Sequence, residues 1–246
     1  MDKIAVISDI HGNLPALEAV LEDIAARDVR TIYCLGDLVG KGPSGDKAID
    51  LVRRRCAAVI RGNWDDFVSR ESGSESEALR WHQSVVGEER LDYLRSLPFV
   101  IEFVLSGRLV RLFHASPRSV YERIQPWDGQ DRLMSLFEPS PHGGRPVPAD
   151  IAGYGDIHNA FVQHLSGRTL FNAGSVGNPL DLPTASYALL EGDFGCDAPA
   201  PWSIQLLRVP YDIERAIREA KAADMQKLAE YELELRTGRY QRLKNG

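Results

Sequence analysis

The sequence has few cysteines and no hydrophobic run long enough to cross a membrane. Its three cysteines are an odd number and form no CxxC pair, which favours free thiols in a reducing compartment over a disulfide framework. The chain passes from Met1 straight into an apolar segment, without the charged region, long apolar region and cleavage site of a secretion signal. We therefore expect a cytoplasmic protein with no membrane partner.

Basic residues are also in the minority, with 29 Lys and Arg against 35 Asp and Glu and a net charge of -6. This balance argues against an extended nucleic-acid-binding surface, although a local pocket can still capture a phosphate. A composition of 43% hydrophobic and 26% charged residues is that of an ordinary globular protein. We expect one domain spanning residues 1–246, with a small molecule as its partner, and the sequence leaves homo-oligomerisation open.

The first third of the chain alternates strand-like and helix-like segments, which is the pattern of βαβ units around a mostly parallel sheet. One helix is expected to begin at Asn13, whose side chain can cap it, with Pro15 in its first turn. A second helix is predicted over residues 44–55. A serine-rich stretch followed by a helical pattern then indicates a helical cap or insertion over residues 65–97.

Hairpins replace the βαβ pattern in the second half of the chain, and Ser106-Gly107 is the first compact turn signal. Further strand-like segments follow near residues 160–165, 168–172, 185–191 and 203–209. This change indicates a second, more antiparallel sheet packed against the first. One long charged helix with an apolar side is predicted over residues 211–236.

Five short apolar runs each end in residues that can bind a metal ion: Asp9 and His11, Asp37, Asn63, His114, and Asp156 and His158. Each residue alone could be an ordinary turn or capping residue, but five coincidences in order favour one shared site. Ligands bind beyond the carboxyl ends of strands in α/β sheets, and Gly36 and Gly62 permit tight turns there. A mixture of carboxylate, imidazole and amide suits manganese, iron, zinc or magnesium.

These segments resemble the motifs of the calcineurin-like metallophosphoesterases. The resemblance runs through Asp9-Ile10-His11-Gly12-Asn13, Gly36-Asp37-Leu38-Val39-Gly40, Gly62-Asn63-Trp64-Asp65, His114 and Gly155-Asp156-Ile157-His158. The late segment Asn172-Ala173-Gly174-Ser175-Val176-Gly177 is similar to that of the small prokaryotic, YfcE-like phosphodiesterases. This resemblance implies an α/β fold, a four-layer αββα sandwich of two mixed β-sheets.

The resemblance also implies a centre of two divalent ions, with manganese favoured and iron, zinc, nickel or magnesium as alternatives. One ion would be held by Asp9, His11 and His158, Asp37 would bridge, and the other would be held by Asn63, His114 and Asp156. In such a centre a metal-bridging hydroxide attacks phosphorus while the ions neutralise charge on the phosphoryl oxygens. Asp37, Asn63 and His114 are accordingly the predicted catalytic residues.

Two positions depart from the family pattern. Trp64 stands where the family often has a histidine after Gly-Asn, and an indole cannot donate a proton as a general acid. We expect this change to shift substrate preference. Asp156 stands where a histidine is usual, and a carboxylate favours harder ions such as manganese or magnesium. The occupancy of the second metal site is therefore left open.

The leading hypothesis is a metal-dependent phosphoesterase that hydrolyses a phosphodiester or phosphomonoester, with small nucleotides as its substrate class. Asn13, Lys41 and Trp64 are candidate substrate-binding residues, and Asp65 is predicted to orient a ligand imidazole. His142, in a Pro/Gly-rich loop, is the other histidine best placed to reach substrate. The alternative is a catalytically weakened phosphoesterase fold that binds a phosphorylated ligand or a protein.

Overall fold

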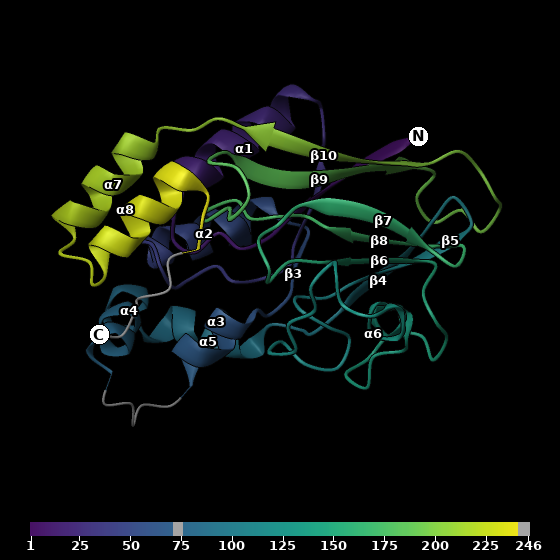
Figure 1. Ribbon diagram of the computed structural model, residues 1–246, viewed down its shortest axis with the longest axis horizontal. Coiled ribbons are helices and arrows are strands. Elements are labelled where there is room, and N and C mark those ends of the chain that lie inside the picture. Colours follow the sequence, from purple (N-terminus) through teal and green to yellow (C-terminus); the bar gives the residue numbers. More distant parts are fainter. Residues whose placement is uncertain (71–75, 241–246) are drawn as a thin grey trace.

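Two mixed five-stranded sheets lie face to face in the computed structural model, which describes residues 1–70 and 76–240 (Figure 1). The strand order of the first sheet is β10-β9-β1-β2-β3, and that of the second is β4-β5-β6-β8-β7. The first sheet contains β1 (Asp2–Ile7), β2 (Thr31–Cys34), β3 (Ala58–Val59), β9 (Ala185–Gly192) and β10 (Ser203–Val209). The second contains β4 (Ile101–Leu105), β5 (Arg108–Leu112), β6 (Ile151–Tyr154), β7 (Phe161–Leu165) and β8 (Arg168–Asn172).

Parallel strands joined by helices form the centre of the first sheet, as the βαβ pattern predicts. Helix α1 (Leu14–Ala26) connects β1 to β2, and α2 (Gly45–Arg55) connects β2 to β3. The Asn13 side chain caps α1 by accepting a hydrogen bond from the Ala16 amide at 3.2 Å. The first predicted helix therefore begins where its capping residue indicates.

The last two strands belong to the first sheet, so their predicted place in the second sheet is wrong. β9 pairs antiparallel with β1, and β10 pairs antiparallel with β9. In the parallel group β1-β2-β3, β1 is the edge strand. Pairing with β9 provides hydrogen-bond partners for the backbone groups on the free edge of β1. Alternation along β9 then buries Ala188 and Leu190 between the sheets and Tyr187 and Leu189 on the helical side.

The period-2 alternation of the strands divides the core into layers. In β1, Ile4 and Val6 face the second sheet, whereas Ala5 and Ile7 face α1 and α2. On the outer face of the second sheet, α6 (Gln130–Met134) and the short 3-10 helix at Ser135–Phe137 pack over β6 and β8. The order helix, sheet, sheet, helix confirms the predicted sandwich.

The predicted cap region consists of three helices next to α2. These are α3 (Asn63–Ser69), α4 (Glu77–Val86) and α5 (Glu88–Ser96), with α4 against α2 and α3 against α5. Most of the serine-rich stretch, residues 71–75, lies outside the described residues. In the view of Figure 1 these cap helices lie below the C-terminal helices.

The C-terminal segment forms two helices rather than the single helix predicted over 211–236. Helix α7 (Ile213–Ala222) and α8 (Leu228–Thr237) are separated by a turn in which Asp224 and Lys227 have left-handed φ values of 49° and 57°. One uninterrupted helix would extend about 40 Å and could not fold its apolar side onto itself. The turn instead lets Leu235 pack into a shared cluster with the buried residues of α7.

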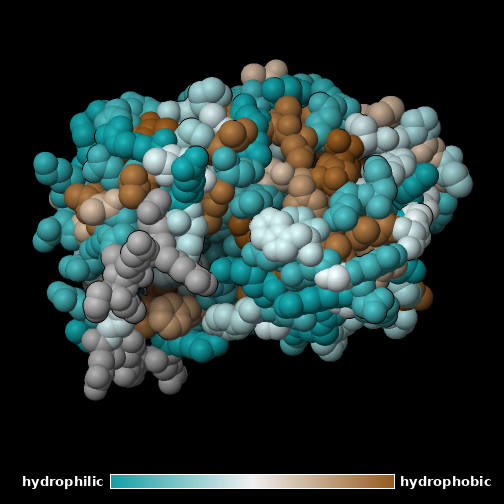
Figure 2. Space-filling view, in the orientation of Figure 1, coloured by the Kyte–Doolittle hydropathy of each residue, from teal (hydrophilic) through white to brown (hydrophobic). Residues whose placement is uncertain are grey.

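No helix in the described parts of the chain is both long and apolar enough to span a membrane. Figure 2 shows that the face seen in Figure 1 is mostly hydrophilic, with its apolar residues in scattered groups. The three cysteines are free, as predicted.

The C-terminal helices are expected to contribute to stability through Leu235, which is 1% exposed, and not through Leu233, which is 44% exposed on the same helix. Leu235→Ala should lower the free energy of unfolding by about 2–5 kcal/mol, because it removes buried methyl groups and leaves a cavity. Leu233→Ala, the matched control, should change it by less than about 0.5 kcal/mol. If the two substitutions lowered the free energy of unfolding in urea equally, α7 and α8 would not be packed as described.

Candidate metal centre

Five of the seven predicted ligands have left-handed backbone conformations. Asp9 and His11 follow β1, Asp37 follows β2, and Asp156 and His158 follow β6, with φ values between 50° and 62°. Residues other than glycine adopt this backbone conformation rarely, because it is energetically unfavourable for them. Residues in such conformations cluster at functional sites. The strand ends are thus bent so that their polar side chains face one another.

Three imidazole nitrogens and two carboxylates converge at these strand ends. The Nε2 atoms of His11 and His158 lie 3.1 Å apart, and Nε2 of His158 is 3.2 Å from Oδ1 of Asp9. The Nε2 atom of His114 lies 2.8 Å from Oδ1 of Asn63 and 3.5 Å from Oδ1 of Asp37. In the described residues two sets could hold a metal ion, Asp9 with His11 and His158, and Asp9 with Asp37 and His114. Asp9 belongs to both sets.

Backbone carbonyl groups orient all three imidazoles. In each ring Nδ1 donates a hydrogen bond to a backbone carbonyl oxygen. His11 donates to Val39 at 3.1 Å, His114 to Leu35 at 2.8 Å, and His158 to Asn178 at 2.5 Å. A proton held at Nδ1 leaves the Nε2 lone pair as an acceptor, which is the form that binds a metal ion. The three rings therefore point their free nitrogens into the centre.

The buried charges of the centre fit a cation. Burial opposes ionisation of Asp9, but the imidazoles of His158, His114 and His11 outweigh it and lower the pKa of Asp9. Burial raises the pKa of Asp37 well above its ordinary value. Oδ1 of Asp9 is buried and has no hydrogen-bond partner among the described residues. A buried acceptor without a hydrogen bond lowers the stability of the folded protein, and a divalent ion bound to this oxygen would remove that penalty.

The motif glycines let backbone and carboxylates approach closely. A Cβ on Gly62 would overlap the carboxylate of Asp37, and a Cβ on Gly155 would overlap Ser8 and the carboxylate of Asp9. Gly36 has a positive φ of 94°, as its predicted turn requires. Gly62 has φ -94°, so a tight turn is not the reason for this glycine; close approach to Asp37 is.

Asp65 contacts backbone amides of two loops and not a ligand imidazole, so the predicted partner of Asp65 is wrong. Its carboxylate accepts hydrogen bonds from the amides of Asp37 at 2.7 Å, Leu38 at 2.8 Å and Gly62 at 3.0 Å. These amides belong to the two loops that carry Asp37 and Asn63. Asp65 therefore links the second and third ligand-bearing strand ends.

Asp156 lies beside the centre but directs both of its oxygens to an arginine. Oδ2 accepts from Nε of Arg123 and Oδ1 accepts from Nη2, each at 3.0 Å. Oδ1 is 4.0 Å from Nε2 of His114, and Asp156 is in neither set of mutually close ligand atoms. The predicted ligand is thus present at the expected strand end, paired with a residue that the sequence analysis did not single out.

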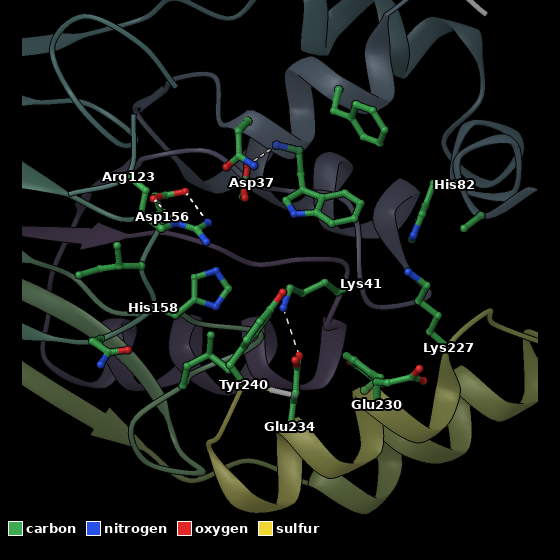
Figure 3. Close-up of a pocket in the computed structure, with 18 of the residues that line it drawn as sticks. Asp37, Lys41, His82, Arg123, Asp156, His158, Lys227, Glu230, Glu234 and Tyr240 are labelled. Atoms are coloured by element: carbon green, nitrogen blue, oxygen red, sulfur yellow. Dashed lines mark hydrogen bonds and ion pairs between the residues drawn. The ribbon is translucent and has the colours of Figure 1, made fainter. Parts of the chain in front are cut away.

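A cleft of about 950 Å³ opens beside these residues (Figure 3). Its walls come from α3 and α4 on one side and from α8 on the other, and Asp37, Asn63, Asp156 and His158 line its floor. Lys41 also lines it, donating to Oδ1 of Asn178 at 2.7 Å and to Oε2 of Glu234 at 3.1 Å. This lysine is anchored, not a solvated turn residue.

Two other predicted contacts with substrate lie away from the cleft. The Asn13 side chain, besides capping α1, donates to the Gly177 carbonyl at 2.8 Å, so the structure gives it a structural role. His142 lines a separate small cavity, stacks on Phe99 at 4.0 Å and contacts the carbonyl of Arg118. Trp64, by contrast, lines the cleft.

Sequence reasoning missed Arg123, Asn178 and Glu234. Asn178 directly follows the Asn172–Gly177 segment, so its contact with His158 could have been sought there. Glu234 accepts from both Asn178 and Lys41, which ties α8 to the carbonyl that orients His158. Arg123 stands in an irregular loop whose sequence carries no signal for its position.

Gly62→Ala should weaken metal binding, because the added Cβ displaces the Asp37 carboxylate. We expect Mn²⁺ affinity, measured by isothermal titration calorimetry, to fall by about tenfold or more. Gly129→Ala is the matched control, because Gly129 has a φ of -56° and no atom within 4 Å of an added Cβ. Unchanged Mn²⁺ affinity in a folded Gly62→Ala protein would contradict this geometry.

Comparison with known proteins agrees with the motifs and the geometry. Residues 2–194 match the calcineurin-like phosphoesterase superfamily domain. The chain is 34% identical over 239 residues to the uncharacterized protein MJ0912 of Methanocaldococcus jannaschii, covering 87% of this chain and 89% of that protein. It is 26% identical over 204 residues to the phosphodiesterase YfcE of Escherichia coli K12, covering 78% of this chain and 89% of that protein.

A solved structure shows the same fold over almost the whole length. The metallophosphoesterase from Sphaerobacter thermophilus has a TM-score of 0.73 and 28% identity, covering 96% of this chain and 99% of that chain. A hypothetical protein from Pyrococcus horikoshii shares the fold with a TM-score of 0.76 at 20% identity, covering 98% of this chain and 100% of that chain. The chain therefore belongs to the calcineurin-like phosphoesterase superfamily and is a phosphoesterase.

Proposed function

We propose that the chain hydrolyses a phosphate ester of a small nucleotide, with phosphodiesters preferred over monoesters that have poor leaving groups. The observation that carries the proposal is the convergence of Asp9, Asp37 and three Nε2 atoms beside a cleft whose floor is lined by Asp37 and His158. Bound there, divalent ions, with manganese as the leading candidate, would supply an activated water and neutralise charge on the phosphoryl oxygens. The three free cysteines support a reducing compartment such as the cytoplasm.

The chain's own residues position the reaction. Asp9, His11 and His158 would hold one ion, and Asp37, Asn63 and His114 lie on the side of a second. The Trp64 amide donates to Oδ1 of Asp37 at 2.8 Å and fixes this carboxylate between the two groups. Substrate would approach from the cleft, because the ligands are otherwise enclosed by the sheets and the motif loops.

The cleft supports a nucleotide as the substrate class. Trp64, Phe67, Trp127 and Tyr240 line it, and Trp127 is 72% exposed at its edge. Exposed aromatic faces next to a phosphate-binding centre are suited to stacking on a base. Lys41, Lys227 and Arg123 add positive charge to walls that also carry Glu230 and Glu234. A cleft of about 950 Å³ matches a small ligand better than a polymer.

The residues around Trp64 favour good leaving groups. Trp64 cannot protonate a departing oxygen. His82, its edge-on neighbour at 6.1 Å between ring centroids, has a pKa lowered to about 4 by burial and is neutral near pH 7. Neither side chain can act as a general acid at neutral pH, so esters that need protonation of the leaving group should react slowly.

One feature favours the alternative of a weakened enzyme that binds a phosphorylated ligand. Asp156 is engaged by Arg123 and does not converge on the second group of ligands. A binding protein would hold phosphate in the cleft without turnover. The activity assay below separates the two functions.

The proposed activity is tested with chromogenic phosphodiester and phosphomonoester substrates in the presence of manganese and other divalent ions. Wild-type protein should hydrolyse the diester, and Asp37→Ala should reduce the rate to the background level, because the central carboxylate is lost. Asp197→Ala, at an exposed loop position, is the control and should keep full activity. Hydrolysis by wild type no faster than by Asp37→Ala with every metal would reject the proposal.

The role of Trp64 is tested by Trp64→His, which places a titratable ring beside the centre. The ratio of kcat/KM on a monoester with a poor leaving group to that on a diester should rise, because the leaving oxygen can then be protonated. Trp64→Phe supplies no proton and should leave this ratio close to wild type. An unchanged ratio in Trp64→His would remove Trp64 as the cause of the preference.

A further inference from the structure

Arg123 is a cation placed directly at the metal centre. Its Nε and Nη2 atoms form a two-point contact with the Asp156 carboxylate at 3.0 Å each, the fork geometry with which arginine binds carboxylates and phosphates. The Asp156 side chain is 3% exposed, whereas that of Arg123 is 57% exposed. The pair therefore has a buried acidic end against the centre and an open basic end in the cleft (Figure 3).

The loop that carries Arg123 is attached to the same strand that carries Asp156. The buried Tyr154, in β6, donates to the Ile124 carbonyl at 2.8 Å. The Arg132 side chain donates to the Arg123 carbonyl at 2.9 Å. These contacts fix the backbone of the loop beside β6, and the two-point contact with Asp156 orients the guanidinium before any ligand arrives.

The contact between Arg123 and Asp156 affects the binding of a second metal ion. Each Asp156 oxygen accepts one hydrogen bond from Arg123, so an ion bound to Asp156 would share its carboxylate with the guanidinium. The remaining set of Asp9, Asp37 and His114 shares Asp9 with the first set. A second ion would also meet the positive charge of the guanidinium. Binding at the second position must therefore compete with Arg123.

The same arginine has donors to offer to a substrate. A guanidinium carries five N–H groups, and Asp156 accepts from Nε and Nη2, so the hydrogens of Nη1 are directed away from this contact. Arg123 lines the cleft together with Asp37, Asn63 and His158. A phosphate bound over the ligands would come within reach of a planar, charged donor that suits its oxygens.

We propose that Arg123, held by Asp156, is a phosphate-binding residue that replaces part of the second metal site, so that one ion binds tightly and the arginine supplies the second positive charge to the phosphoryl oxygens. The proposal deepens the proposed function and rests on it for the identity of the ligand. It makes Arg123 and Asp156 one unit, which accounts for a carboxylate where a histidine is usual.

The first arm of the experiment counts ions. Metal-free protein is titrated with Mn²⁺, and free Mn²⁺ is followed by electron paramagnetic resonance. Wild type should bind one ion tightly and a second at least tenfold more weakly. Arg123→Gln should tighten the second ion by about tenfold, because Asp156 is released and a repelling charge is lost. In the Arg123→Gln, Asp156→Asn double variant the second ion should stay weak, because the freed carboxylate is gone.

The second arm measures inorganic phosphate binding to the Mn²⁺-loaded protein by calorimetry. Arg123→Gln and the double variant should each weaken phosphate by about tenfold, the loss expected for one charged donor pair. The double variant replaces the ion pair by a neutral pair and leaves no unpaired Asp156 carboxylate, so it remains informative even if Arg123→Gln alone is poorly folded. Arg53→Gln, at a half-exposed arginine of α2 paired with Glu89, is the control and should change neither arm.

Two equally tight ions in wild type, or phosphate affinity unchanged in both Arg123 variants, would overturn the proposal. Neither arm depends on turnover. Absence of hydrolysis with Arg123-dependent phosphate binding would therefore reject the enzymatic function alone, whereas hydrolysis with Arg123-independent phosphate binding would reject this inference alone.

Discussion

The structure depends on the burial of the Asp9 carboxylate among three imidazoles, at the place where the two sheets meet. Asp9 follows β1 of the first sheet, and its Oδ2 accepts from the amide of Asp156, which follows β6 of the second. Its Oδ1 has no hydrogen-bond partner in the described chain and faces the nitrogens of His11 and His158. A buried charge of this kind needs a cation, so the packing of the two sheets is coupled to the binding of a metal ion.

The unusual local features of the chain serve that arrangement. Left-handed conformations bend the strand ends inward, and the motif glycines leave space for the carboxylates of Asp9 and Asp37. Asp65 holds the Asp37 and Asn63 loops together through three amides. From the other side, α8 reaches the centre through Glu234 and Asn178, whose carbonyl orients His158. Strain at the centre is therefore balanced by contacts from several elements.

Sequence alone was sufficient where the signal is local. The polar residues at the strand ends, the Asn13 cap and the hairpin turn at Ser106 could all be predicted, because each depends on a few neighbouring residues. The sheet that receives β9, and the break between α7 and α8, could not, because they depend on which apolar faces meet after folding. Arg123 was missed for the same reason: only the folded loop brings it to Asp156.

The central claim is that these strand ends form a real metal centre, and anomalous diffraction at the manganese absorption edge tests it most directly. Crystals of the protein grown with Mn²⁺ should show a strong anomalous peak among Asp9, His11 and His158, on the side toward Asp37. A peak elsewhere, or none at this position with the three imidazoles still turned inward, would contradict the account.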